Sequence, residues 1–320
     1  MMILFYVALA LAALFVGLFV YTVRKVRRVE AALPPDGRFV DVPGARLHVV
    51  ERGQGPALLL VHGLSGQLGN FGYGMIEPLA RDFRVVAVDR PGSGYSVRTP
   101  GARADLAAQA DVLAALIDKL GLERPLVVGH SLGGAIALAL AAAHPDRVAG
   151  LALLAPLTHP AREIPLVFRP LTIRQPWLRK LVAWTLAVPM SDLRRDEVLA
   201  MVFGPDPVPA DFALRGGGML ALRPSHFMAA SEDLVAGAPG MGPLAARYGE
   251  LRLPVSILFG REDRILDPAA NGEALAARVP DAALTLVPGG HMLPITAADT
   301  CVDFVRKAAA RLRDTEAVTA

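Results

Sequence analysis

The stretch 125-PLVVGHSLGGAIALALAAAH-144 decides the fold. Its first six residues form an apolar run typical of a buried strand, and residues 132–144 are apolar nearly all round, as in a buried helix. Between them stands Ser131, flanked by Gly129 and Gly133 in a G-x-S-x-G pattern. A turn this tight needs glycines because Cβ atoms at those positions would clash. The pattern predicts a nucleophile elbow, in which the Ser131 hydroxyl is exposed at the carboxyl end of the strand.

Apolar runs and helical patterns alternate on both sides of this unit. Apolar runs at 57–63, 83–89, 125–130, 148–156, 254–260 and 283–289 predict six strands, and 38–42 with 45–53 predict a hairpin before them. Helical patterns lie at 104–120, 132–144, 271–279 and 301–313. The alternation predicts a mainly parallel sheet of eight strands, flanked by helices on both faces.

Residues 157–250 interrupt this alternation, because they contain no comparable strand pattern. They hold both tryptophans, Trp177 and Trp184, with several prolines and scattered Met and Phe. We expect a helical cap inserted after the sixth strand, which has a small core of its own and serves as a lid over an apolar pocket. The expected division is 1–23 for a transmembrane anchor, 24–37 for a basic linker, 38–156 with 251–315 for the α/β core, and 157–250 for the cap.

The N-terminal segment is long enough to cross a bilayer. Residues 3–20 carry no charge, and about 20 apolar residues span the hydrocarbon core as a helix. A buried core helix and a cleaved signal peptide are the alternatives, but a signal peptide carries its positive charge before the apolar region. Here the charges follow it, as Arg24, Lys25, Arg27 and Arg28. We therefore expect a single-pass anchor, with the catalytic domain on the cytoplasmic side.

Composition narrows the possible partners. The formal net charge is +3, and the four juxtamembrane cations account for it, so a nucleic-acid surface is not expected. We expect these cations to meet anionic lipid headgroups. Cys301 is the single cysteine, which excludes an intrachain disulfide and a site built from several cysteines; it is expected to be a small packing residue in a helix.

Two glycine-containing turns follow neighbouring strands before the serine. In 61-VHGLSG-66 the glycine lets the backbone bend toward the elbow, so the N–H groups of Leu64 and Leu132 are the expected oxyanion-hole donors, with His62 and His130 structural. The second turn, 89-DRPGSGYS-96, lacks the lysine of a P-loop and the spacing of a dinucleotide fingerprint. We interpret it as a structural turn near the mouth of the site.

Two later loops supply an acid and a base. In 260-GREDRILDP-268, Asp263 is the preferred carboxylate to orient a histidine, with Asp267 and Glu262 as rivals. In 288-PGGHMLP-294, His291 follows two glycines after the last strand, 28 positions beyond Asp263. The order along the chain is therefore Ser131, Asp263, His291, which differs from both serine-protease orders.

With these motifs the chain resembles the α/β-hydrolase fold superfamily from about residue 36 to residue 315. The resemblance implies that Ser131 attacks an acyl carbonyl, that His291 transfers the proton, and that Asp263 orients His291, with no metal or organic cofactor. Haloalkane dehalogenases and epoxide hydrolases of this superfamily use aspartate at the elbow, so Ser131 argues against both. The lid and anchor favour carboxylic esters of hydrophobic, lipid-like substrates. The alternatives are a thioesterase, a carbon–carbon bond hydrolase and a binding protein that has lost catalysis.

Overall fold

The structure is a computed structural model that describes residues 1–161 and 163–319. Its strands are β1 (Arg38–Val42), β2 (Ala45–Arg52), β3 (Ala57–Val61), β4 (Arg84–Val88), β5 (Val97–Arg98), β6 (Leu126–His130), β7 (Gly150–Leu154), β8 (Val255–Gly260) and β9 (Ala282–Val287). Its longer helices are α1 (Met2–Ala32), α4 (Leu106–Leu120), α5 (Leu132–Ala143), α9 (Pro224–Gly237) and α13 (Ala298–Thr319). The shorter ones in the core are α2 (Gly69–Gly72), α3 (Ile76–Leu79), α10 (Met241–Ala246), α11 (Ala274–Ala276) and α12 (Leu293–Thr296).

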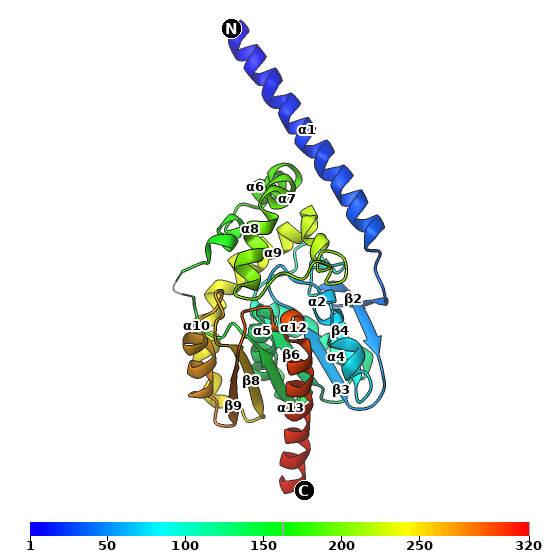
Figure 1. Ribbon diagram of the computed structural model, residues 1–320, viewed down its shortest axis with the longest axis vertical. Coiled ribbons are helices and arrows are strands. Elements are labelled where there is room, and N and C mark those ends of the chain that lie inside the picture. The colour runs from blue at the N-terminus through cyan, green and yellow to red at the C-terminus, as the bar shows by residue number, and fades with distance from the viewer. Residues whose placement is uncertain (162, 320) are drawn as a thin grey trace.

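The strands form one twisted sheet in the order β1-β2-β4-β3-β6-β7-β8-β9 (Figure 1). The strands from β4 to β9 in this order run parallel, whereas β2 is antiparallel to both of its neighbours, β1 and β4. The predicted eight strands are confirmed, with ends within two residues. The structure adds β5, which pairs with the start of β2. Two residues are too few to give a periodic pattern, so the sequence did not indicate this strand.

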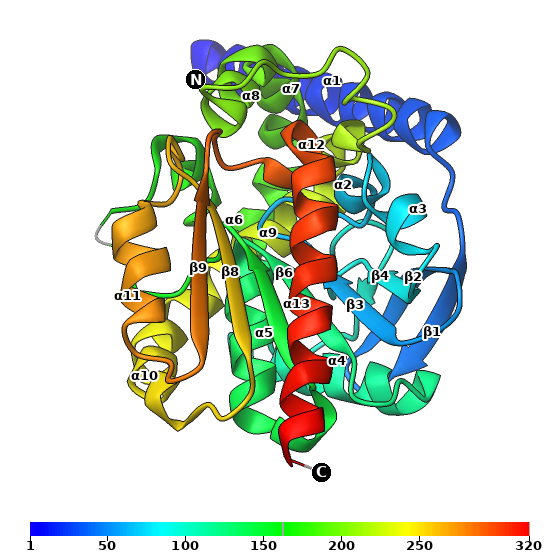
Figure 2. The same cartoon turned by 60° about the horizontal axis from the view of Figure 1, so that its bottom comes forward.

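Two apolar clusters sandwich the sheet because successive side chains of a strand point to opposite faces. Leu58 and Leu60 of β3 pack on one face with α3, α12 and α13, whereas Leu59 and Val61 pack on the other with α4 and α5. Figure 2 shows α13 crossing the first face and α4 and α5 behind the sheet. Helix α5 is buried around its whole circumference, as its sequence predicts. Cys301 of α13 is fully buried in the cluster that also contains Leu58 and Leu60.

Helix α4 illustrates how the sequence sets the element boundaries. The Asp105 carboxylate caps its first turn by accepting a hydrogen bond from the Ala108 N–H at 3.0 Å. Gly121 ends it in the left-handed conformation with φ 58°, which glycine adopts without the steric cost of a Cβ atom. The predicted helix at 271–279 is shorter in the structure, which has a π-helical turn at Ala269–Glu273 followed by α11.

Between β7 and β8 the described residues contain helices and loops and no strand. The longer segments before α9 are a 3-10 helix at Leu166–Leu171, α6 (Pro176–Val182), a π-helical turn at Ala183–Ala187, α7 (Val188–Leu193) and α8 (Arg195–Phe203). These lie beyond the carboxyl end of the sheet, above the loops that follow the parallel strands (Figure 1). At the end of the region, Met241 and Tyr248 pack into the same apolar cluster as α5, so this part of the chain contacts the sheet layer.

Helix α1 is by length and composition able to cross a membrane, a property that a signal sequence shares. Residues 2–17 of this helix are exposed, and its second half lies against the cap helices (Figure 1). Val29 is fully buried in a cluster with Val188, Leu220 and Leu222. The helix continues without a break to Ala32, so the apolar segment and the basic segment that follows it form one element.

Candidate active site

Ser131 occupies a strained turn between β6 and α5. Its φ of 53° and ψ of −120° lie in a region that residues with a Cβ atom rarely adopt, at a cost of about 1–3 kcal/mol. A Cβ atom on Gly129 would lie 2.7 Å from the Gly133 carbonyl oxygen, and one on Gly133 would overlap the Val61 carbonyl. A Cβ on Gly63 would lie 2.8 Å from that of Ser131. The sequence therefore keeps glycine wherever the backbone approaches this turn.

His291 is paired with a carboxylate. Its Nδ1 lies 2.7 Å from Asp263 Oδ2, and both side chains are almost completely buried. The other carboxylate oxygen accepts hydrogen bonds from the Ile265 and Leu266 N–H groups at 2.8 and 2.9 Å. With Nδ1 donating to the carboxylate, Nε2 carries the lone pair, so the ring is held in the tautomer of a general base.

The two rival carboxylates lie elsewhere. Asp267 is exposed and accepts a hydrogen bond from the Ala269 N–H at 2.8 Å. Glu262 is also exposed and accepts a hydrogen bond from the Gly289 N–H at 2.7 Å. Both carboxylates therefore stabilise local turns, and the carboxylate bonded to His291 is that of Asp263.

The serine and the histidine come from the carboxyl ends of parallel strands. Ser131 follows β6 and His291 follows β9, and His130, next to the serine, donates a hydrogen bond from Nε2 to the His291 carbonyl at 3.0 Å. Within the described residues no hydrogen bond joins the Ser131 hydroxyl to the His291 ring. Such bonds are often long without substrate and tighten when substrate binds.

His130, which directly precedes Ser131, and His62, in the loop after β3, are neutral structural groups. Burial lowers the pKa of His130 to about 3 and holds the pKa of His62 well below its usual range. His62 Nε2 accepts a hydrogen bond from the Arg90 N–H at 2.9 Å, so its proton is on Nδ1, which donates to the Gly63 carbonyl at 2.8 Å. Each ring thus has a fixed tautomer that holds a loop of the site.

The two expected oxyanion donors lie on the loops beside Ser131. Leu64 follows the Gly63 turn, and Leu132 is the first residue of α5. Neither N–H makes a backbone hydrogen bond within the described part of the chain. The N–H of Leu132 is also one of the unsatisfied donors at a helix N-terminus, where the helix dipole favours negative charge.

Arg90 is a site-supporting residue that the sequence did not single out. Its side chain is 1% exposed and donates to the His62 carbonyl at 2.9 Å and to the Gly63 carbonyl at 3.0 Å. The same guanidinium donates to Asp233 of α9 at 2.6 Å. Arg90 therefore joins the loop that carries Leu64 to the cap. The partners lie 143 positions apart, so no local pattern could have indicated the pair.

The turn at 89–96 is built around one buried carboxylate. Asp89 accepts hydrogen bonds from the Leu68 N–H at 2.8 Å, from the Tyr95 N–H at 2.9 Å and from His48 Nδ1 at 2.7 Å. Gly94 has φ 51°, and a Cβ atom there would overlap the Asp89 carboxylate. The turn thus fixes the loop after β3 relative to the loop after β4, in agreement with the structural role predicted for it.

One buried histidine of the cap, His226, also faces this region. Burial lowers the pKa of His226 on α9 to about 4, although a backbone hydrogen bond with Ser65 partly opposes this shift. No group of three or more His, Cys, Asp or Glu side chains in residues 1–161 and 163–319 is arranged to hold a metal ion. The chemistry that these groups can perform is proton transfer between a serine hydroxyl and a histidine, beside free backbone N–H donors.

Comparison with known proteins agrees with this geometry. A family model described as alpha/beta hydrolase fold matches residues 56–298, which include β3, the serine turn, the cap and both loops that supply Asp263 and His291. "Putative carbamate hydrolase RutD" of Caulobacter sp. (strain K31) is 30% identical over 256 residues, which are 75% of this chain and 85% of that protein.

Two further similarities are more limited. The dihydrolipoyllysine-residue acetyltransferase component of the acetoin cleaving system of Cupriavidus necator is 40% identical over 122 residues, 38% of this chain; the match covers only about a third (32%) of that protein's length. The crystal structure of a membrane phospholipase A has a TM-score of 0.69 and 24% sequence identity, with 97% of each chain covered. At this identity the likeness concerns the fold alone, over 97% of the chain.

Proposed function

Because the chain belongs to the α/β-hydrolase fold family, we propose that it is a serine hydrolase that cleaves carboxylic esters of hydrophobic substrates through an acyl-enzyme. Membership of the family supports hydrolase activity in general. The proposal adds the kind of bond that is cleaved and the residues that cleave it. One observation carries it: the buried 2.7 Å contact between His291 Nδ1 and Asp263 Oδ2, on the loops beside the Ser131 turn. A histidine held in this way can accept a hydroxyl proton on Nε2.

In the proposed reaction the Ser131 oxygen attacks the ester carbonyl and its proton passes to His291 Nε2. His291 then gives this proton to the leaving alcohol, and the acyl group remains on the serine. A water molecule attacks the acyl carbon next, its proton passing to His291 and then back to the serine oxygen as the carboxylic acid leaves. Asp263 stabilises the imidazolium in both halves of the cycle.

We assign the oxyanion hole to the N–H groups of Leu64 and Leu132. Both are free of backbone partners, and each such donor contributes about 3 kcal/mol to stabilising the transition state. Arg90 supports the first donor because it holds the two carbonyl groups just before Leu64.

The hydrophobic substrate class is supported by the apolar surface that the cap presents next to α1. The cap carries large apolar side chains that are exposed on the segment next to α1: Trp177, Leu181, Leu186, Met190 and Leu193. Exposed apolar patches of this kind mark membrane or ligand surfaces. A cap of this character suits an acyl chain better than a polar substrate.

We also propose that α1 is a retained membrane anchor with the hydrolase domain on the cytoplasmic side. The packing of Val29 against cap residues supports retention, because removal of the helix would expose the cluster it completes. The basic residues after the apolar segment support the orientation by the positive-inside rule and would contact anionic headgroups.

The experiment is hydrolysis of p-nitrophenyl esters from acetyl to palmitoyl by the full chain in neutral detergent. Ser131→Ala should lose activity, whereas Ser225→Ala, which changes an exposed serine of the cap, should retain it. We expect the largest kcat/KM at eight carbons or more. Faster turnover of acetyl than of octanoyl esters would contradict the substrate class. No ester hydrolysis, with Ser131 still reactive to a fluorophosphonate, would indicate a thioester or a carbon–carbon bond as the target.

A further inference from the structure

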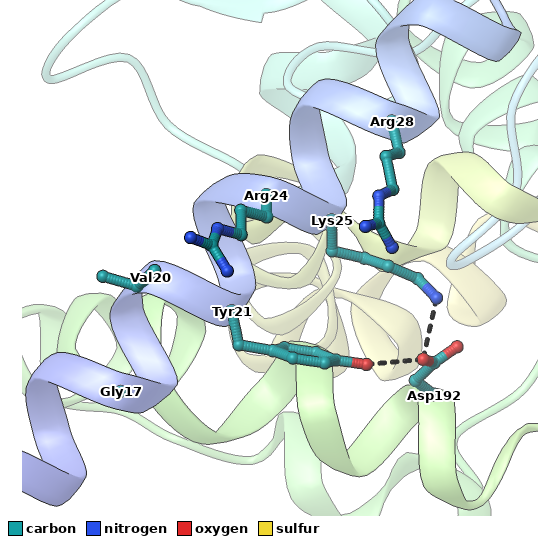
Figure 3. Close-up of a pocket in the computed structure, with 7 residues that line it drawn as sticks. All are labelled: Gly17, Val20, Tyr21, Arg24, Lys25, Arg28 and Asp192. Carbon is teal, nitrogen blue, oxygen red and sulfur yellow. Dashed lines mark hydrogen bonds and ion pairs between the residues drawn. The ribbon is translucent and has the colours of Figure 1, made fainter.

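A hollow of about 610 Å³ lies between α1 and α7, and Ser131, Asp263 and His291 are not among the residues that line it (Figure 3). Gly17 and Val20 line one end, and Arg24 and Arg28 line the other. All four belong to α1, where the apolar segment gives way to the basic one. Over the seven residues from Gly17 to Arg24 the helix rises about 10 Å, so the lining changes from apolar to cationic over that distance.

One wall of the hollow is formed by Tyr21, Lys25 and Asp192, where the first two side chains bond to the third and brace α1 against α7. Asp192 of α7 accepts a hydrogen bond from the Tyr21 hydroxyl at 2.6 Å and forms an ion pair with Lys25 Nζ at 2.7 Å (Figure 3). The brace attaches α1 to the cap and neutralises the charge of Lys25. Lys25 is therefore already engaged and is not the cation available to a ligand.

Arg24 and Arg28 are the cations that remain available. They lie one helical turn apart, and neither makes a hydrogen bond or ion pair within the described residues. Two neighbouring guanidinium groups repel each other, and a shared anion relieves that repulsion. The planar donor fork of arginine matches the oxygens of a phosphate group.

The apolar end of the hollow has room for a hydrocarbon chain. A Cβ atom added at Gly17 would meet nothing within 4 Å, and the helix around it is exposed and apolar. Phe19 packs on Trp184 of the cap with ring centroids 5.7 Å apart. Tryptophan is enriched where hydrocarbon meets headgroups, which is the depth at which a lipid phosphate lies.

We propose that this hollow binds one anionic phospholipid, with its phosphate between Arg24 and Arg28 and an acyl chain along Gly17 and Val20. The proposal rests on the anchor role proposed above for α1. It goes beyond a diffuse attraction between basic residues and the membrane, since Arg27 is part of the same basic cluster but does not line the hollow. The bound lipid would fix α1 against α7, and with it the cap against the bilayer.

Arg27 supplies the matched control. Full-length protein is purified in neutral detergent with equal amounts of phosphatidylglycerol and phosphatidylcholine, and bound lipid is counted by native mass spectrometry. We expect one phosphatidylglycerol per chain, retained at least tenfold less by Arg24→Gln and by Arg28→Gln, and retained within twofold by Arg27→Gln. Equal losses in all three variants, or no preference for phosphatidylglycerol, would overturn the proposal.

Two further measurements distinguish binding of a whole lipid from binding of free phosphate, and distinguish this site from the hydrolase site. Gly17→Leu changes no charge and should reduce lipid retention several-fold, because its side chain would occupy the apolar end. Millimolar inorganic phosphate should not displace the lipid; full displacement would mean a site for free phosphate and would overturn the proposal. Hydrolysis of a soluble ester should stay unchanged in all these variants, so failure of this site and failure of the proposed reaction are distinguishable.

Discussion

Replacement of Asp233 by asparagine should destabilise the protein by about 3–5 kcal/mol, because it removes the counter-charge of a buried arginine. The Asp233 side chain is 0% exposed and accepts hydrogen bonds from Arg90 at 2.6 Å and from Gln109 at 3.3 Å, as well as from Arg98. Arg98 keeps a second carboxylate, that of Glu232 at 2.6 Å. Arg90 has no other carboxylate partner among the described residues, so its charge would remain buried and uncompensated.

The assay is urea unfolding of the full chain in detergent, followed by tryptophan fluorescence and far-ultraviolet circular dichroism. The chain has two tryptophans, Trp177 and Trp184, and both lie in the cap, so fluorescence reports on the cap and dichroism on the whole fold. Asp233→Asn should shift both transitions, because Asp233 links the cap to the loop that carries Leu64.

The matched control is Asp196→Asn, which alters an ion pair with Arg195 at 3.3 Å whose carboxylate side chain is 91% exposed. Exposed pairs contribute about 0–1 kcal/mol, so this variant should be nearly as stable as the wild type. A loss below 1 kcal/mol for Asp233→Asn, or a loss equal to that of Asp196→Asn, would refute the role assigned to the buried pair.

Three more predictions follow from single contacts. Gly94→Ala should lose about 3 kcal/mol in the same unfolding assay, because φ is 51° and the new Cβ would overlap the Asp89 carboxylate; a neutral effect would contradict this. Burial lowers the native pKa of His226 to about 4, so below pH ~6.5 the unfolded chain binds a proton that the native chain does not. Stability should therefore fall as pH drops from ~6.5 to 4, and His226→Gln should reduce this slope by up to about 1.4 kcal/mol per pH unit; an unchanged slope would contradict the assignment. Asp263→Asn should lower kcat on esters by about 10⁴-fold with little change in KM, and a loss below tenfold would remove Asp263 from the proposed mechanism.

Local patterns were sufficient to predict most of the fold. The strands β3, β4, β6, β7 and β8 are short apolar runs with clear ends, and each lies where the sequence predicted it. The glycines around Ser131 were predictable as well, because steric exclusion at a tight turn restricts residue type directly. The order of the strands and the loops that follow them predicted that His291 meets the 260–268 loop, whereas the final choice of Asp263 over Asp267 and Glu262 came from the structure.

Contacts between distant segments were not predictable in this way. Arg90 and Asp233 carry no local signal, since an arginine after a strand and an aspartate on a helix are usually solvated. The attachment of α1 to α7 through Asp192 depends equally on the tertiary arrangement. Trp177, expected among the residues of a small cap core, is 68% exposed instead and lines an open surface hollow with Phe19 of α1.

We infer above that Ser131 is an activated nucleophile, and a fluorophosphonate probe reports on this property, because the probe reacts only with an activated serine. Labelled full-length protein would be digested and the modified residue located by mass spectrometry. We expect one modified serine, Ser131, with labelling lost in Ser131→Ala and strongly reduced in His291→Gln. An unlabelled Ser131 in the folded wild type, or labelling that is indifferent to His291, would contradict this inference.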